Sequence, residues 1–179
     1  MRPVYPEYLN DFAVLTCPSD PNADMSPSIG AQADAQKLIN NSAYTYLGYV
    51  ITNDAELQSF LKAYSDRLAS GQPFNADLDV PGGTGTGGGD KILRLREGIE
   101  KLLPAGAGKN AEAYAESAIP IMWDRIGGSL DDFYHIPGGI NVLYMDGHVE
   151  FIRYPGKWPA TKKAMELWSK FDLLGPEKE

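Results

Sequence analysis

The segment from residue 135 to residue 154 constrains the fold of this chain more than any other. Two runs of apolar, strand-forming residues flank the pair Asp146-Gly147. This pair is preferred in two-residue type I′ turns, because both central positions of that turn need a positive φ. The segment therefore predicts a β-hairpin in which residue 144 faces 149 and residue 142 faces 151. In that register one apolar face of the hairpin comprises Val142, Tyr144, Val149 and Phe151.

Composition predicts a single globular domain over residues 1–179. Hydrophobic residues make up 43% and charged residues 22% of the chain, close to the averages of folded proteins. The formal net charge is −8, with no cluster of Lys and Arg. A nucleic-acid partner is therefore not expected, because the phosphate backbone would be repelled.

Several further elements follow from local patterns. The sequence predicts strands over 12–16, 43–51 and 117–123, with Pro120 marking a sheet edge or an irregularity. Helices are predicted over 31–39, 54–69, 90–103 and 159–173. The helix over 54–69 has the best-defined start, because Asn53 and Glu56 have the spacing of a capping box.

A glycine-rich stretch interrupts the pattern over residues 72–89. It contains eight consecutive residues, 82–89, that are all Gly or Thr. Glycine loses the most backbone entropy on ordering and has no side chain to pack, so we expect a flexible surface loop. Gly83, Gly85 and Gly88 match a dinucleotide-binding pattern, but no full apolar strand precedes them, so nucleotide binding is disfavoured.

A family resemblance rests on two segments. One is the hairpin segment, through His135, Gly138, Gly139, Asn141, Asp146, Gly147 and His148; the other is Val14-Leu-Thr-Cys17-Pro-Ser-Asp20. They resemble the C-terminal His…Asp-Gly signature and the Cys-Pro-Ser region of prepilin-type, pseudopilin-like proteins of the planctomycete type. Nine residues separate the His from the Asp-Gly pair in that family, whereas ten separate His135 from Asp146. This difference weakens any role that needs a fixed His-to-Asp geometry.

The resemblance implies an α+β, pilin-like head domain with an antiparallel sheet of about four strands packed by helices. It implies a non-enzymatic structural subunit of a type IV pilin-like or type II secretion pseudopilin-like filament, extracellular or periplasmic at the cell surface. The partners would be other pilin or pseudopilin subunits. Family members begin with a long apolar helix, and the sequence has no run approaching the ~18 to 20 apolar residues that span a bilayer. Membrane contact is therefore expected only through such an absent helix.

Cys17 is the only cysteine, so it cannot form a disulfide within the chain. A buried, small apolar side chain is the simplest interpretation, and a reactive nucleophile is the alternative. The resemblance adds a third interpretation, because relatives often carry another Cys just after the apolar helix. In this interpretation Cys17 is a disulfide cysteine whose partner was lost with that segment.

Metal ligands would come from acidic and histidine residues near the hairpin. Asp146 and His148 are candidates for a transition metal, and Asp131 and Asp132 for Ca²⁺. Each has a simpler explanation: Asp146 as a turn residue, His148 as a strand residue, and Asp131 and Asp132 as solvated loop charges. We therefore expect no cofactor, with Ca²⁺ as the alternative, because some pseudopilins carry it near their C-terminal loops.

Two other functions stay open. A surface binding module for a glycan or a secreted protein would use Tyr and Trp side chains, with Trp158 the one expected to be exposed. A metal-dependent hydrolase would need His135, Asp146 and His148 to converge in a cleft. The sequence has no Gly-x-Ser-x-Gly elbow, no evident Cys/His pair and no distinct acid–base pair of carboxylates, so no catalytic residue is predicted.

Overall fold

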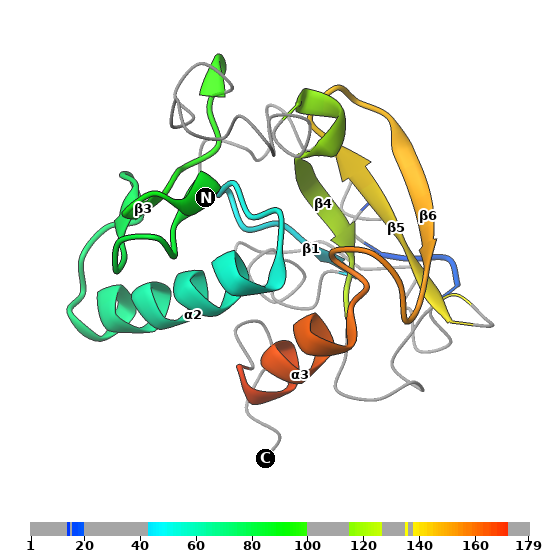
Figure 1. Cartoon of the computed structure of the whole chain (residues 1–179). Helices are drawn as coiled ribbons and strands as arrows, with labels where there is room; N and C mark the ends of the chain where they lie inside the picture. The colour runs from blue at the N-terminus through cyan, green and yellow to red at the C-terminus, as the bar shows by residue number, and fades with distance from the viewer. Residues whose placement is uncertain are drawn as a thin grey trace, which may run out of the picture.

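The described part of the chain combines an antiparallel sheet, a separate two-stranded ribbon and two α-helices (Figure 1). The computed structural model describes residues 14, 16–19, 43–99, 115–126, 135 and 138–171. The helices are α2 (Asp54–Ala69) and α3 (Lys162–Lys170), and the strands are β1 (Tyr44–Thr45), β2 (Leu78–Asp79), β3 (Lys91–Ile92), β4 (Pro120–Asp124), β5 (Gly139–Tyr144) and β6 (Val149–Arg153). The helix predicted over 31–39 and most of the strand predicted over 12–16 lie outside the described residues.

The four-stranded sheet has the strand order β1-β4-β5-β6, with every neighbouring pair antiparallel. The predicted α+β fold with about four antiparallel strands is thereby confirmed. Pro120 leaves the expected irregularity, a register shift between Pro120 and Met122, although β4 lies inside the sheet and not at its edge. The strand predicted over 43–51 is shortened to β1, and Tyr49 forms only an isolated bridge with Arg94.

The hairpin at Asp146-Gly147 is confirmed, but its predicted register is wrong by one residue. Leu143 pairs with Val149 and Asn141 with Phe151. The turn is a three-residue loop, because the Gly147 N–H donates to the Tyr144 carbonyl at 2.9 Å and only Gly147, with φ 90°, is left-handed. A one-residue shift moves every side chain of β6 to the other face. Val149 and Phe151 are therefore 61% and 45% exposed.

Helix α2 begins and ends where the sequence predicts. Asn53 Oδ1 accepts hydrogen bonds from the N–H groups of Ala55 and Glu56, and Glu56 Oε2 accepts one from the Thr52 N–H at 2.7 Å. Helix α3 is shorter than predicted. Thr161 caps it by accepting a hydrogen bond from the Ala164 N–H, so the helix starts after Thr161 and not at Pro159.

Two buried clusters share side chains and so form a continuous core. One lies between α2 and the β2–β3 ribbon, and the other covers the face of the sheet that α3 approaches. Leu47, Trp158 and Trp168 pack against both clusters. The sequence predicts an exposed Trp158, but this side chain is only partly exposed. Its Nε1 donates to the Ile51 carbonyl at 2.9 Å. Its apolar ring is better placed in the core, with the indole N–H satisfied by backbone.

The helix predicted over 90–103 is wrong for residues 90–99. Residues 91–92 form β3, which pairs with β2 across the glycine-rich stretch. The sequence predicts a flexible surface loop over this stretch, but Thr86 within it is only 1% exposed and is therefore packed against the rest of the chain. Within the described ranges no helix has the length and apolar character needed to cross a membrane.

Candidate functional site

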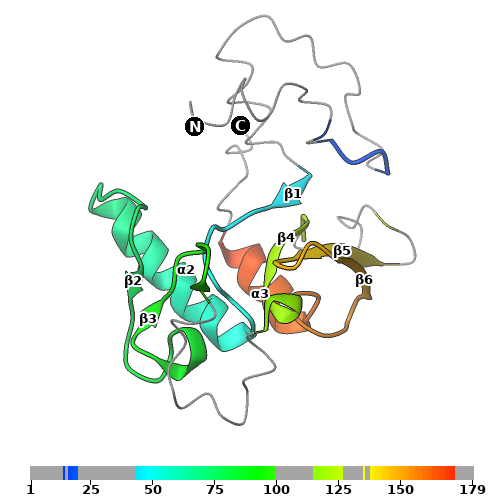
Figure 2. The same cartoon turned by 90° about the horizontal axis from the view of Figure 1, so that it is seen from above.

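Four side chains from distant parts of the sequence meet on the face of the sheet opposite to α3. Asp124 ends β4, Asn141 lies in β5, His135 precedes β5, and Cys17 belongs to the segment 16–19. Figure 2 shows this segment and α3 on opposite sides of the sheet. We call these four residues the Asp124 cluster.

The centre of the Asp124 cluster is one carboxylate oxygen. Asp124 Oδ2 accepts hydrogen bonds from the Asn141 N–H at 2.6 Å and from Asn141 Nδ2 at 3.0 Å. His135 Nε2 lies 3.0 Å from the same oxygen. Because the Asp124 side chain is only 3% exposed, these donors replace the water that a charged carboxylate would otherwise need. A proton on His135 Nε2 would let the ring donate to this oxygen, and Asn141 Nδ2 lies 3.0 Å from the same nitrogen.

The geometry does not match a nucleophile–base–acid relay. In such a relay one imidazole nitrogen faces the nucleophile and the other faces the orienting carboxylate. Here His135 Nε2 is the atom closest to both partners, 3.9 Å from Cys17 Sγ and 3.0 Å from Asp124 Oδ2. A nitrogen that donates its proton to Asp124 cannot also remove one from the thiol. The arrangement therefore suits holding two segments against the sheet.

Cys17 is buried, as the simplest interpretation of the sequence predicts, with 2% of its surface exposed. Its Sγ lies 3.9 Å from His135 Nε2, a contact that the sequence alone does not reveal. Phe151 lies beside the Asp124 cluster, with its ring edge-on to the His135 ring and the two centroids 6.3 Å apart. The same ring covers Gly139, where an added Cβ would clash with it. Gly138 has a φ of 109°, an angle that favours glycine, whereas Gly139 leaves the space that the Phe151 ring occupies.

Asp146 and His148 form a second pair at the tip of the hairpin. Asp146 Oδ1 lies 2.5 Å from His148 Nδ1 and accepts a hydrogen bond from the His148 N–H at 3.1 Å. These hydrogen bonds hold the pKa of the Asp146 carboxyl below its usual range. The His148 ring stacks on Tyr144 with centroids 4.4 Å apart. Strand β5 separates this pair from His135, which contacts Asn141, so the convergence that the hydrolase alternative requires is not found.

Of the four metal candidates, only Asp146 and His148 lie in the described part of the chain. Asp131 and Asp132 lie outside the described residues. Within the part of the chain that the structure describes, no group of three His, Cys, Asp or Glu side chains is arranged to hold a metal ion.

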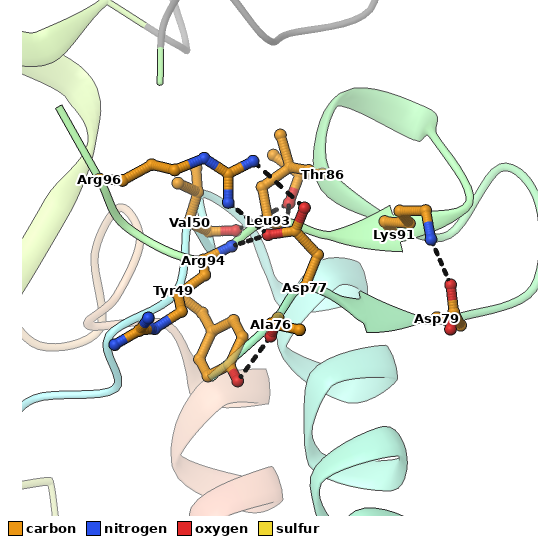
Figure 3. Close-up of polar contacts among 10 residues, drawn as sticks. All are labelled: Tyr49, Val50, Ala76, Asp77, Asp79, Thr86, Lys91, Leu93, Arg94 and Arg96. Carbon is orange, nitrogen blue, oxygen red and sulfur yellow. Dashed lines mark hydrogen bonds and ion pairs between the residues drawn. The ribbon is translucent and has the colours of Figure 1, made fainter. Parts of the chain in front are cut away.

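The β2–β3 ribbon and the glycine run between its strands, together called the glycine-rich ribbon, hold a third polar network (Figure 3). Asp77 accepts hydrogen bonds from the Arg94 N–H at 2.8 Å and from Arg96 Nη1 at 2.7 Å. Arg96 and the Arg94 N–H together lower the pKa of Asp77, with the Arg96 side chain making the larger contribution. An exposed Lys91–Asp79 pair joins β3 to β2.

The same ribbon does not offer a phosphate site. The N–H groups of Gly83 and Gly85 both donate to the Gly89 carbonyl, and the Gly87 N–H donates to Glu56 Oε1 at 3.1 Å. A phosphate-binding loop needs free N–H groups and a helix N-terminus. Here the donors are used internally, and a carboxylate occupies the place beside Gly87.

Sequence reasoning missed the Asp124 cluster as a unit. It names Cys17, His135 and Asn141 separately, and Asp124 is only one of several acids near the hairpin segment. A signal is available, since Asp124 is a charged residue that follows the apolar run 119–123. No protein-family model matches the chain, and no curated protein or solved structure is significantly similar to it.

Proposed function

We propose that the chain is a non-enzymatic, pilin-like or pseudopilin-like structural subunit whose sheet packs against an apolar helix in a filament at the cell surface. The proposal joins the sequence resemblance to one structural observation. The face of the sheet opposite to α3 carries apolar side chains that its own described helices leave uncovered. Val149 and Phe151 are among the most exposed large apolar residues, and Leu143 beside them is partly exposed.

Uncovered apolar side chains on neighbouring strands favour packing against another surface. Leu143 and Val149 are direct cross-strand neighbours, and Phe151 follows on the same face of β6. A helix lying across β5 and β6 would cover all three. The hydrogen-bonded Asp124 cluster lies beside this apolar surface and supports a structural role, because its histidine is held by the carboxylate and not directed at a substrate.

The test is incorporation into surface filaments. Cells that express the chain are sheared, and the filament fraction is probed with an antibody against the chain. We expect the chain in this fraction and expect Leu143→Lys to reduce its amount several-fold, because a buried ammonium disfavours helix packing. Leu68→Lys is the control, since Leu68 is 59% exposed on α2, away from the sheet face.

Absence of the chain from the filament fraction would contradict the proposal. Equal incorporation of the Leu143→Lys variant and the wild-type chain would contradict the assignment of this face. Circular dichroism of the purified variants verifies that both remain folded.

A further inference from the structure

Strand β6 forms one edge of the four-stranded sheet, and its register determines which backbone groups face outward. The Tyr144 N–H donates to the His148 carbonyl at 3.0 Å, and the Tyr154 N–H donates to the Gly138 carbonyl at 3.2 Å. Even-numbered residues of this segment therefore exchange hydrogen bonds with β5. In an antiparallel ladder the alternate residues direct their N–H and C=O groups to the other side. Those residues are Val149, Phe151 and Arg153.

The outward N–H groups of β6 are not used by the rest of the described chain. Among the described residues, no turn, loop or neighbouring strand accepts a hydrogen bond from the N–H of Val149, Phe151 or Arg153. Among the outward carbonyl groups, that of Arg153 is less accessible to a partner strand, because Gly156 lies close to it. The side chains of the same three residues are exposed. Figure 1 shows β6 at the margin of the sheet.

We propose that β6 pairs with β6 of a second copy of this chain, antiparallel and about a twofold axis at Phe151. The Phe151 N–H of each copy donates to the carbonyl of the partner's Phe151. The Arg153 N–H of each copy donates to the carbonyl of the partner's Val149. The two four-stranded sheets become one continuous sheet, and the contact is closed, giving a dimer and not a chain of subunits.

The side chains of β6 fit this self-pairing. Phe151 faces the partner's Phe151, and Val149 faces the aliphatic stem of the partner's Arg153. On the other face Glu150 faces the partner's Ile152, so no like charges stand directly opposite each other. Glu150 is already paired with Lys157 at 2.5 Å. The opposite edge of the sheet competes weakly for β6, because β1 contains only two residues.

Exposed edge strands in soluble proteins are usually protected by charges, prolines or bulges. Strand β6 carries two charges, Glu150 and Arg153, but neither stands opposite a like charge in the proposed pairing, and Val149 and Phe151 supply apolar contacts between the copies. The proposal does not depend on the proposed function, because its hydrogen bonds come from the backbone edge of β6, although Val149 and Phe151 contribute side chains to both surfaces.

Hydrogen exchange of the full chain tests the interface residue by residue. We expect the amides of Phe151 and Arg153, the two donors of the proposed pairing, to exchange at least about tenfold more slowly in concentrated than in dilute protein. The amides of Glu150 and Ile152 bond to β5 and should be protected at both concentrations. A monomer by sedimentation up to about 1 mM, or a dimer that leaves the Phe151 and Arg153 amides unprotected, would overturn the proposal.

A charge pair of variants tests the orientation. Val149→Lys places a cation beside the partner's Arg153 and should weaken dimerisation by about tenfold or more. Val149→Glu places an anion there and should keep or tighten the dimer. Leu68→Lys, at 59% exposure against 61% for Val149, is the matched control and should leave the dimer unchanged. Equal weakening by both Val149 variants would overturn the twofold pairing, because an unoriented apolar contact predicts that result.

Discussion

The hydroxyl group of Thr86 donates a hydrogen bond to the carbonyl oxygen of Val50, at 3.0 Å and across 36 residues of sequence. The same hydroxyl oxygen accepts a hydrogen bond from the Leu93 N–H at 3.0 Å. One buried side chain thus joins the glycine-rich ribbon to the segment that leads into α2. Glu56 adds a second connection through Gly87. The glycine run is therefore part of the packed structure at its centre.

Replacing Thr86 by Val should lower the free energy of unfolding by roughly 1 to 3 kcal/mol. The substitution keeps the shape but leaves a buried carbonyl and a partly buried N–H without a partner, which costs about this amount. Urea denaturation followed by circular dichroism measures the change. Thr84→Val is the control, because the Thr84 hydroxyl bonds only to Pro81 at an exposed position. Equal effects of the two substitutions would show that the connection contributes little.

Gly85 should be far less tolerant of a side chain than Gly82. A Cβ at Gly85 would clash with the backbone of Lys91, whereas a Cβ at Gly82 meets nothing within 4 Å. We expect Gly85→Ala to cost about 1 to 3 kcal/mol, the range for overpacking, and Gly82→Ala to leave stability almost unchanged. Melting temperatures of the two variants decide the point. A melting temperature that is unchanged in both would mean that the ribbon can shift to admit the methyl group.

Gly147 carries the turn of the β5–β6 hairpin. Its φ of 90° is rarely adopted by β-branched residues, and an added side chain meets no neighbouring atom within 4 Å. Gly147→Val should therefore lower stability by backbone strain alone, by roughly 1 to 3 kcal/mol. The same substitution at Gly82, where neither strain nor contact is present, serves as the control. An unchanged melting temperature of the Gly147→Val variant would contradict the positive φ.

The strengths and failures of the sequence predictions have physical causes. Helix α2 is predicted in full, because Asn53 marks its start and its apolar residues recur only at helical spacing. Residues Ile92, Leu95 and Ile99 also recur at helical spacing, yet a ribbon forms there, since pairing across the glycine run is not visible in a local window. The predicted hairpin register is wrong because Asp-Gly suits both a two-residue and a three-residue loop, which differ by one residue in pairing.

The Asp124 cluster could not have been predicted from spacing. Cys17 and His135 are 118 residues apart, and only the folded sheet places them together. The sequence shows Asp124 after an apolar run and Asn141 in the signature 17 residues later, but their contact depends on which strands become neighbours. Sequence patterns therefore identified the residues, whereas topology determined their contacts.

The carboxyl group of Asp146 should titrate below the usual range of aspartate because its hydrogen bonds with His148 lower its pKa. His148→Ala removes the side-chain partner and should move this pKa back toward the ordinary value, measured by NMR titration of the carboxyl carbon. A depressed pKa in the folded state contributes stability above the unfolded-state pKa. That contribution is lost as the pH falls through the folded-state pKa. Lys157→Ala, which removes the ion-pair partner of Glu150 on the same hairpin, should leave the Asp146 titration unchanged.

Cys17 should react slowly with thiol reagents in the folded protein. Its side chain is buried, and His135 is held by Asp124 and not free to activate it. We expect alkylation on the order of a hundredfold slower, or more, than in urea, because reaction requires local opening of the segment around Cys17. Asp124→Ala should speed the reaction, since it removes the acceptor that holds His135 and the Asn141 N–H in place. Fast reaction of the native wild-type thiol, unchanged by Asp124→Ala, would instead favour the interpretation of Cys17 as a reactive nucleophile.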